Sequence, residues 1–352
     1  MKSLNYIGSK HTLLKTITEI ININIGDTSS MSFMDLFAGT GVVGHNMLKQ
    51  FKTCDANDLE KYSYIINYAL LKCNFSNKLK QIIESCNNPD FNEEGLIYKN
   101  YSPNENCERM FFTNGNAKKA DAIRSYIEKS LNEKQITDDE YYFLIASLLV
   151  SIDKVANTSC VYGAYLKSYK TSALKDLLLV PIHINEKMNT TSNTVYNLLA
   201  ENFSKPESKY YDVIYMDPPY NQRQYGGNYS PLNFVADYNS STVLTGKTGL
   251  IENYNKSSFC KKGEVRKTFC ELISGLKCKY LIISYNNEGL LSIDEFREIL
   301  IKKGAVKLYK IKYNKFKAQQ SVDIKNTEEY LWVVDTTKKS EVIDEITFDL
   351  IK

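Results

Sequence analysis

The run Asp217-Pro218-Pro219-Tyr220 carries the groups best suited to chemistry in this chain of 352 residues. It follows an apolar, β-favouring segment, residues 213–216, which predicts a short buried strand. Each proline fixes its φ angle and lacks an N–H group, so a stiff loop is expected at the carboxyl end of that strand, where open α/β sheets bind ligands. A carboxylate, two proline carbonyls and an aromatic ring can grip an exocyclic amine and stack on its ring. Taken alone, the run could also be a simple tight turn.

A second candidate site lies within residues 32–51. Residues 32–37 predict a strand, Ala38-Gly39-Thr40-Gly41 a glycine loop, and residues 42–51 a helix, an arrangement that lets a ligand approach the backbone at a helix N-terminus. The spacing is not G-x-G-x-x-G and no G-K-[ST] follows, which disfavours dinucleotide and P-loop sites. The spacing of Asp35, Phe37, Gly39 and Gly41 instead resembles the S-adenosylmethionine-binding pattern. Asp35 could then engage the ammonium of that cofactor, while Phe37 packs on its apolar part.

Two flanking segments could complete a cofactor site. Gly8-Ser9 predicts a turn that opens a helix over residues 11–21, so Lys10 would stand at the helix entrance and meet an anion, although a solvated lysine is the simpler alternative. A weak strand over residues 52–57 ends near Asp58 and Glu60. An acid about 20 residues beyond a glycine loop is the usual acceptor for ribose hydroxyls. Asp58 is the preferred candidate, Glu60 is the alternate, and either could be a surface acid.

Residues 74–194 interrupt the pattern of a parallel sheet. Residues 86–106 predict a loop, and residues 117–131 and 138–157 predict helices. Residues 158–170, which include Tyr162 and Lys167, interleave tyrosines with lysines and serines. This composition suits base stacking and phosphate contacts, and a half-buried loop is an equally good alternative. A second polar segment directly follows the catalytic run and is well placed to meet a substrate; it contains Arg223, Tyr225 and Asn228.

The C-terminal third contains two further candidate contacts for a nucleic acid. Gly246-Lys247-Thr248-Gly249 lacks the strand and the spacing of a P-loop, so it predicts a turn that touches a phosphate. Residues 280–285 and 329–334 predict strands, and residues 292–302 a helix. Residues 302–317 hold seven lysines, among them Lys315 and Lys317, and no acid. Lysines protect edge strands, but the lack of any balancing acid favours a ridge that binds a nucleic-acid backbone.

Composition limits the class of protein. The chain is 43% hydrophobic and 12% aromatic, enough for a large core, and its net charge of only +3 requires any nucleic-acid surface to be local. The eight cysteines include no C-x-x-C pair and have no histidine at metal spacing, which predicts reduced thiols and no metal site. Without an apolar run of membrane-spanning length or a signal peptide, we expect a soluble cytoplasmic protein with no membrane partner.

Three ordered motifs resemble those of adenine-specific DNA N6-methyltransferases of the Dam-like, D12 class of restriction-modification enzymes. They are Asn5 to Lys10, Asp35 to Gly41 and Asp217 to Tyr220. One departure is visible, because the family often has an acid before the catalytic strand, near the adenine of the cofactor, where Leu199 stands here. The resemblance spans nearly the whole chain, since further similar stretches lie at residues 157–158, 162–167, 222–225, 246–249, 284–289 and 313–318.

The resemblance implies an α/β, class I S-adenosylmethionine-dependent methyltransferase fold. This is a Rossmann-like, mostly parallel seven-stranded sheet with helices on both faces and an antiparallel hairpin near its end. Residues 1–73 and 195–352 would form the catalytic domain, and residues 74–194 an inserted, mainly helical target-recognition region. The implied cofactor is S-adenosyl-L-methionine with no metal, and its site would contain Tyr6, Lys10, Asp35, Phe37, Gly39, Gly41 and Asp58.

The implied substrate is an adenine flipped out of double-stranded DNA. Tyr220 would stack on the base, while Asp217 and the Pro218 carbonyl accept hydrogen bonds from N6 and Pro219 completes the loop. A monomer is expected, and a cognate restriction endonuclease is an open question. The expected DNA contacts are Tyr162, Lys167, Arg223, Tyr225, Asn228, Lys247, Lys315 and Lys317.

Two other classes of function compete with this interpretation. One is an amino-methyltransferase for cytosine N4, RNA adenine or a protein amide, but such enzymes more often carry Ser or Asn in place of Asp217. The other is a non-catalytic DNA-binding homologue, which would typically have lost the glycine loop or the catalytic loop, and both are intact here.

Overall fold

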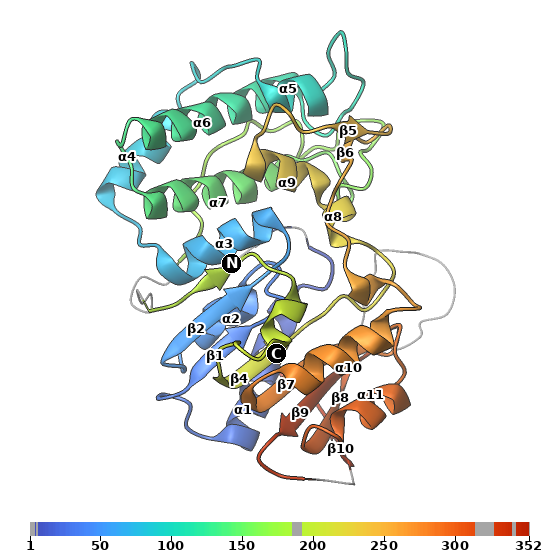
Figure 1. Ribbon diagram of the computed structural model, residues 1–352. Coiled ribbons are helices and arrows are strands. Elements are labelled where there is room, and N and C mark those ends of the chain that lie inside the picture. Colours follow the sequence, from blue (N-terminus) through green and yellow to red (C-terminus); the bar gives the residue numbers. More distant parts are fainter. Residues whose placement is uncertain (1–3, 5, 185–191, 314–326, 340–342, 352) are drawn as a thin grey trace.

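A computed structural model describes residues 4, 6–184, 192–313, 327–339 and 343–351 (Figure 1). Eight of its strands form one sheet in the order β10-β8-β9-β7-β4-β1-β2-β3. These strands are β1 (Ser32–Asp35), β2 (Thr53–Asn57), β3 (Val195–Tyr196), β4 (Tyr211–Met216), β7 (Cys278–Asn286), β8 (Ala305–Tyr313), β9 (Thr327–Asp335) and β10 (Ile343–Phe348). A separate antiparallel pair consists of β5 (Leu244–Thr245) and β6 (Leu250–Ile251).

The large sheet is parallel except at one strand. β9 runs antiparallel to both of its neighbours, β7 and β8, while every other pairing in the sheet is parallel. This confirms the predicted mostly parallel α/β fold with an antiparallel hairpin near its end. The number of strands differs from the expected seven, because β10 adds an eighth strand parallel to β8.

Helices cover both faces of the sheet. Successive strand residues point to opposite faces, so Phe33 packs with α1 and α2 while its neighbour Met34 packs with α10 and α11. Within the described residues, no helix is both long and apolar enough to cross a membrane. The helices of four residues or more are η1 (Lys10–Leu13), α1 (Leu14–Ile25), α2 (Val42–Met47), α3 (Lys61–Lys72), α4 (Asn77–Cys86), α5 (Leu96–Tyr101), α6 (Asn114–Asn132), α7 (Asp138–Lys154), η3 (Ala200–Ser204), α8 (Tyr225–Asn228), α9 (Ser230–Asp237), α10 (Val265–Gly275) and α11 (Ile293–Leu300).

A helical region lies beyond the α3 end of the sheet (Figure 1). Helices α3 to α7 share one hydrophobic core, and α9 contributes Leu232, Phe234 and Val235 to the same core. Although sequence analysis assigned only residues 74–194 to this region, α9 comes from the segment that follows the catalytic loop. The chain therefore returns to the helical region after β4, which connects the two parts of the molecule beside the cavity described below.

Several elements differ from the sequence-based expectations. Helix α5 lies inside the predicted loop 86–106, where the carboxylate of Asp121 accepts hydrogen bonds from the backbone N–H groups of Ile97 and Tyr98 and so caps the helix from a distance. Strand β8 is not an edge strand, because β10 covers it, so that alternative for residues 302–317 was wrong. Lys315 and Lys317 lie outside the described residues.

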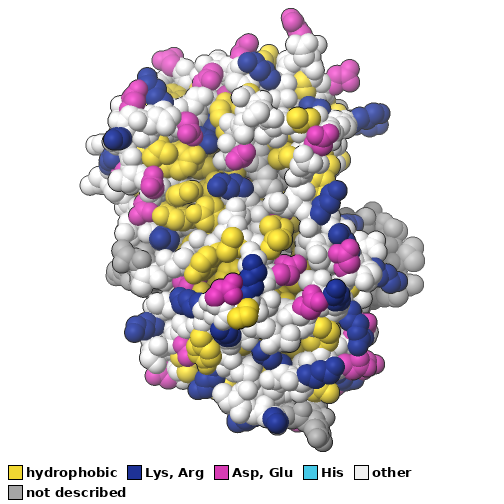
Figure 2. All heavy atoms as spheres, in the orientation of Figure 1, with side chains coloured by type: hydrophobic (Ala, Val, Ile, Leu, Met, Phe, Trp, Pro, Cys, Tyr) yellow, Lys and Arg dark blue, Asp and Glu magenta, His cyan; other side chains and the backbone are white. Residues whose placement is uncertain are grey.

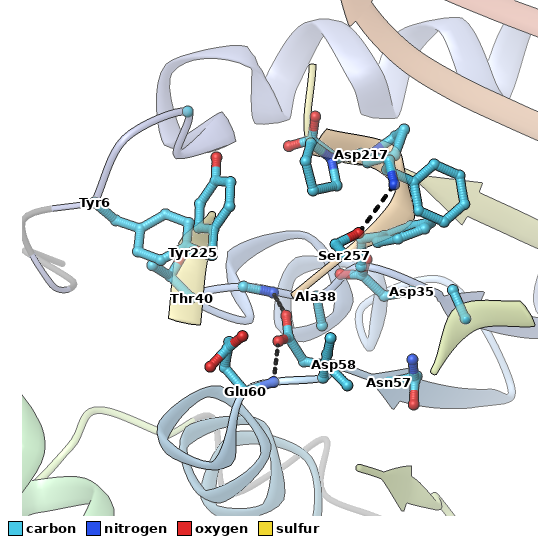
Figure 3. A pocket seen from close by; sticks show the side chains of 18 of the residues that line it. Tyr6, Asp35, Ala38, Thr40, Asn57, Asp58, Glu60, Asp217, Tyr225 and Ser257 are labelled. Atoms are coloured by element: carbon cyan, nitrogen blue, oxygen red, sulfur yellow. Dashed lines mark hydrogen bonds between the residues drawn. The ribbon is translucent and has the colours of Figure 1, made fainter. Parts of the chain in front are cut away.

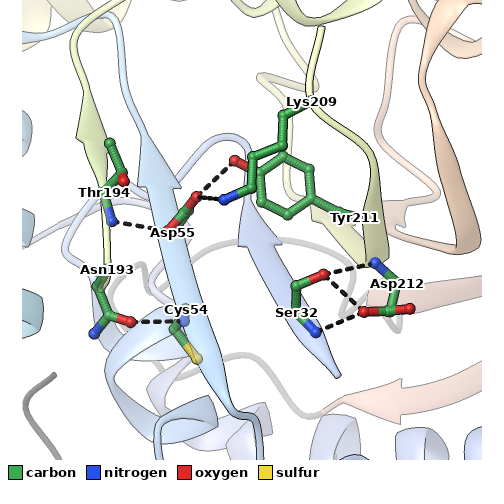
Figure 4. A network of polar contacts seen from close by, with 8 residues as sticks. All are labelled: Ser32, Cys54, Asp55, Asn193, Thr194, Lys209, Tyr211 and Asp212. Carbon is green, nitrogen blue, oxygen red and sulfur yellow. Dashed lines mark hydrogen bonds and ion pairs between the residues drawn. The ribbon is translucent and has the colours of Figure 1, made fainter. Parts of the chain in front are cut away.

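Two carboxylates, Asp55 in the middle of β2 and Asp212 near the start of β4, fix how the strands align (Figure 4). Asp55 of β2 accepts hydrogen bonds from the Tyr211 hydroxyl at 2.7 Å and from the Thr194 N–H at 2.8 Å, and it pairs with Lys209 at 2.8 Å. Asp212 of β4 accepts from both the N–H and the hydroxyl of Ser32 in β1. These contacts hold β1, β2 and β4 side by side, so their carboxyl ends reach the same edge.

Replacing Asp55 is therefore expected to destabilise the protein. Asp55→Ala leaves the buried Tyr211 hydroxyl and the Thr194 N–H without their acceptor, which should lower the free energy of unfolding by about 2–4 kcal/mol. Urea unfolding followed by circular dichroism measures this change. The exposed Asp90 offers a matched control, and Asp90→Ala should stay within about 0.5 kcal/mol of wild type. Equal stability of the two variants would contradict the structural role of Asp55.

Candidate active site

One cavity lies at the carboxyl ends of β1, β2 and β4 (Figure 3). It encloses about 970 Å³ of empty space, its open mouth included. The two candidate sites from the sequence share this cavity, since its lining includes Tyr6, Lys10, Asp35, Phe37, Gly39, Asp58, Asp217, Pro218, Pro219, Tyr220 and Tyr225.

The glycine loop needs both of its glycines. Gly39 and Gly41 have φ angles of +51° and +75°, a region that side chains rarely adopt. A Cβ atom at Gly39 would lie 3.1 Å from the Tyr6 ring, and one at Gly41 would lie 2.6 Å from Leu70. Gly39 lines the cavity, whereas Gly41 lies behind the loop against α3. Gly41, predicted to line the cofactor site, is not among the lining residues, and its role in this arrangement is to let the loop turn into α2.

Asp35 is a buried carboxylate with one unused oxygen. Its Oδ2 atom accepts a hydrogen bond from the Gly44 N–H at 3.0 Å, while its buried Oδ1 atom has no partner among the described residues. Burial raises the pKa of Asp35 to about 8 despite the Gly44 hydrogen bond. Buried polar atoms in proteins normally have partners. A cationic group of a ligand in the cavity would supply the missing one.

Asp58 and Glu60 meet at the end of β2. The Asp58 carboxylate accepts hydrogen bonds from the N–H groups of Gly39 at 2.7 Å and Glu60 at 2.8 Å (Figure 3), and burial raises its pKa. Burial also raises the pKa of Glu60 to about 8, and Glu60 accepts a hydrogen bond from Asn233 of α9. Both acids line the cavity. The geometry keeps both as candidates for ribose hydroxyls, because each carboxylate oxygen has a second lone pair.

The catalytic loop is fixed by an ion pair that sequence analysis did not anticipate. Lys10 Nζ lies 2.9 Å from Asp217 Oδ1 and also 2.9 Å from Glu329 Oε1. Burial raises the pKa of Asp217 to about 6, against the opposing effect of the Lys10 ammonium. Burial disfavours the charge of Lys10, but the two carboxylates outweigh it and raise the Lys10 pKa well above its usual value. Lys10, which was predicted to bind an anion, therefore pairs with two carboxylates of the protein itself.

Tyr220 closes the catalytic loop. Its carbonyl accepts a hydrogen bond from the Leu290 N–H at 2.9 Å, and its half-buried ring lies near Gly8. Beside it, Tyr6 stacks on Tyr229 with ring centroids 4.8 Å apart and contacts Tyr225 at 5.5 Å. Tyr225, predicted from the sequence to contact DNA, thus lies in the aromatic wall of the cavity.

Several lining residues were missed by the sequence analysis. Phe259 packs edge-on against Phe37 at 5.1 Å, and Ser257 exchanges two backbone hydrogen bonds with the side-chain amide of Gln224. These residues lie far from the glycine loop in sequence and carry no recognisable motif, so only the fold brings them to the cavity. At the position of the family's missing acid, Leu199 is 47% exposed and lines the cavity together with Leu198 and Glu201.

Charge in the cavity favours a cationic ligand. Among the described lining residues, Lys10 is the one basic side chain, whereas five carboxylates are present. A net excess of buried acids is costly without a counter-charge. The five carboxylates belong to Asp35, Asp58, Glu60, Glu201 and Asp217.

The remaining predicted DNA contacts lie outside the sheet. Lys167, Arg223 and Lys247 lie between helices and strands and are exposed, whereas Asn228 is the last residue of α8 and its carbonyl accepts a hydrogen bond from the Tyr162 N–H at 2.8 Å. The predicted turn at Gly246–Gly249 is confirmed, because it connects β5 to β6. The Arg109 guanidinium donates hydrogen bonds to two backbone carbonyls of this turn. On the face drawn in Figure 2, lysines and arginines are interspersed with acids, so this face has no broad basic patch.

One predicted DNA contact does not fit the structure. The Tyr162 side chain is only 1% exposed, its hydroxyl donates to Asp153 at 2.9 Å, and its ring stacks near Phe111. A ring in the hydrophobic core cannot stack on a base. The alternation of tyrosines and lysines in the sequence was misleading because it did not distinguish a half-buried loop from an exposed one.

Comparisons with known proteins agree with the motifs. Residues 6–299 match the family model of D12 class N6 adenine-specific DNA methyltransferases. The chain is 41% identical to the type II methyltransferase M.NlaIII of Neisseria lactamica, a match that covers 95% of this chain and 100% of that protein. It is also 41% identical to M.CviAII of Paramecium bursaria Chlorella virus 1 over 95% of this chain and 99% of the relative. A putative class I S-adenosylmethionine-dependent methyltransferase from Listeria monocytogenes is a more distant structural neighbour, with 12% identity, a TM-score of 0.40 and coverage of 99% of this chain and 68% of that one.

The raised pKa of Asp35 predicts a pH-dependent penalty on the stability of the ligand-free protein. Because the folded-state pKa of about 8 exceeds the unfolded value of 3.8, the folded state binds more protons, and stability is lost as the pH rises from about 4 to 8. Asp35→Asn removes this loss. Between pH 5 and pH 8, the variant should gain about 2–4 kcal/mol relative to wild type in urea unfolding. Asp90→Asn serves as the control, and parallel pH profiles for wild type and Asp35→Asn would refute the prediction.

Proposed function

This chain belongs to the D12 class of N6 adenine-specific DNA methyltransferases, and we propose that its cavity methylates N6 of adenine at a specific sequence in double-stranded DNA. One observation carries the proposal: the glycine loop from Asp35 to Gly41 and the catalytic loop from Asp217 to Tyr220 line the same cavity. A methyl donor bound at the first loop would face an amine held by the second.

S-adenosylmethionine fits the residues on the glycine-loop side of this cavity. The unpartnered Oδ1 atom of Asp35 suits the ammonium of the methionine moiety, Asp58 or Glu60 suits the ribose hydroxyls, and Phe37 offers an apolar surface. The excess of carboxylates suits a ligand with two positive charges. When bound, the cofactor supplies a sulfonium methyl group, whose carbon–sulfur bond breaks as the bond to N6 forms, leaving the electron pair on sulfur.

The catalytic loop would hold the target base. An adenine inside a duplex is out of reach, so it would be flipped into the cavity at a cost of a few kcal/mol. Tyr220 would stack on the flipped base, while Asp217 and the Pro218 carbonyl accept hydrogen bonds from the two N6 hydrogens. This arrangement directs the N6 lone pair toward the methyl donor, and such positioning can account for much of the rate increase.

Asp217 would also stabilise the positive charge that develops on N6. As N6 gives its lone pair to the methyl carbon it becomes positive, and a nearby carboxylate stabilises that charge. With a pKa of about 6, Asp217 is ionised at neutral pH. It can then take one proton from the methylated nitrogen and pass it to solvent, which restores a neutral amine.

DNA contacts are proposed on exposed segments outside the sheet. Lys167, Arg223 and Lys247 would contact phosphates, while Asn228 and Tyr225 would contact the DNA near the target base; Lys315 and Lys317, outside the described residues, remain candidates. Phosphate contacts fix position and base contacts give specificity. We further propose a monomer that protects its recognition sequence against a cognate restriction endonuclease and works in the cytoplasm.

Methyl transfer to DNA is the direct test of this proposal. Purified protein with methyl-labelled S-adenosylmethionine should label mixed-sequence duplex DNA, and nucleoside analysis should identify N6-methyladenine. Asp217→Asn keeps the size of the side chain but removes its charge, so kcat should fall by about 100-fold or more, while the Kd for S-adenosylmethionine changes little. Label recovered in N4-methylcytosine, in RNA or in protein, or full activity of the variant, would overturn the proposal in favour of one of its alternatives.

The ring of Tyr220, rather than its hydroxyl, is expected to matter. Tyr220→Phe keeps the stacking surface and should retain most of the activity, whereas Tyr220→Ala removes stacking that is worth about 1–3 kcal/mol. The loss in kcat/KM for DNA should therefore be about 5- to 150-fold for Tyr220→Ala. Fluorescence of 2-aminopurine at the target position measures base flipping in the same variants. Equal losses for the Phe and Ala variants would show that the hydroxyl, not the ring, is needed.

A further inference from the structure

We propose that Glu329 is a positioning residue for methyl transfer, which acts through Lys10 to orient Asp217 and to keep its negative charge available to the target amine. This inference rests on the proposed function. Glu329 lies on β9, more than a hundred residues beyond the catalytic loop in sequence, and none of the sequence motifs includes it.

Glu329, Lys10 and Asp217 form a line of two ion pairs that leads into the cavity. Lys10 Nζ lies 2.9 Å from Glu329 Oε1 on one side and 2.9 Å from Asp217 Oδ1 on the other. Lys10 and Asp217 line the cavity, whereas Glu329 does not. The Ser284 hydroxyl donates to the same Oε1 atom of Glu329 at 2.8 Å. Glu329 is thus held from behind by β7, and it can reach the reaction only through Lys10.

This line fixes which oxygen of Asp217 faces the substrate. Lys10 engages Oδ1, so Oδ2 is the oxygen that the ion pair leaves for another donor. Lys10 itself is held at two points, because both carboxylates are 2.9 Å away and its side chain is only 7% exposed. A lysine with a single partner would be less restrained. Glu329 therefore leaves one defined oxygen of Asp217 for an N6 hydrogen.

The two ion pairs also set the net charge beside the N6 amine of the target base. A pair of Lys10 and Asp217 alone would be neutral, and its effect on a developing positive charge would largely cancel. With Glu329 the group carries a net charge of −1, in a buried setting where charges are weakly screened. The second carboxylate compensates Lys10, so the negative charge of Asp217 stays effective toward N6.

Other titratable groups also face Asp217, and they come from several elements. The tyrosines are uncharged at neutral pH because burial raises their pKa values, and burial likewise raises the pKa of Asp35 to about 8. Among the described groups near Asp217, Lys10 and Glu329 are therefore the ones joined to it through ion pairs. The other groups that interact with Asp217 are Asp35, Tyr215, Tyr220 and Tyr225, while the Glu288 carboxylate acts on Tyr220.

Glu329→Gln tests this role with little change in shape. The amide oxygen can still accept from Ser284 and Lys10, and the remaining Lys10–Asp217 pair is neutral, so the fold should survive. Glu328→Gln is the matched control, since it removes the same charge from the adjacent residue of β9, whose side chain points to the opposite face. Both variants should bind S-adenosylmethionine with a Kd within about threefold of wild type.

Two measurements separate a positioning role from a structural one. Glu329→Gln should lower kcat on duplex DNA by about tenfold or more. It should also move the acidic limb of the kcat profile to lower pH, because the Glu329 carboxylate raises the pKa of Asp217. In the ligand-free protein, 13C NMR titration of Asp217, assigned with Asp217→Asn, should show the same downward shift. Glu328→Gln should change neither.

The possible results distinguish failure of the role of Glu329 from failure of the proposed function. Wild-type kcat and an unshifted titration in Glu329→Gln would overturn the inference, as would a lower melting temperature with no change in either. If wild-type protein transfers no methyl group to DNA, the proposed function fails. The NMR titration of Asp217 in the free protein still decides whether Glu329 controls its charge.

Discussion

Parallel pairing of β1 with both β2 and β4 is the constraint on which the site depends. Parallel strands end at one common edge, so Asp35, Asp58 and Asp217, which come at or just after three strand ends, are brought together from distant parts of the sequence. The alignment is set away from this edge, where Asp55 in the middle of β2 and Asp212 near the start of β4 bind residues of neighbouring strands. Contacts that never touch the cavity therefore determine its geometry.

The cavity gathers acidic side chains whose ionisation is unfavourable before any ligand is bound. Burial raises the pKa values of Asp35, Asp58, Glu60 and Asp217, which means that the free protein pays for each ionised group in stability. Lys10 offsets part of this cost at the catalytic loop, whereas the described residues give the Oδ1 atom of Asp35 no partner at all. A cationic cofactor would relieve the cost at the glycine loop, so the same carboxylates that weaken the free protein can strengthen cofactor binding.

Local patterns in the sequence predicted the sheet and both loops, because these depend on short-range features: alternating apolar strands, glycines with positive φ and prolines that end β4. Contacts that depend on tertiary packing were not predictable in this way. Glu329 is one of three acids in β9 and belongs to no motif, Tyr162 is buried because Tyr229, which directly precedes α9, and the helical core surround it, and α5 is capped by Asp121 from another helix. In each case a residue distant in sequence decides the outcome.

The cavity also joins the two halves of the molecule. Glu60, at the end of β2, accepts a hydrogen bond from Asn233 of α9, and the hydroxyl of Tyr229 accepts one from the Ile7 N–H. Tyr6 stacks on Tyr229 while it closes the space above Gly39. The wall beside the glycine loop is thus built partly from the helical region. Movement of that region on DNA would reach the cofactor side of the cavity through these contacts, because they join residues of the helical region directly to residues that line the cavity.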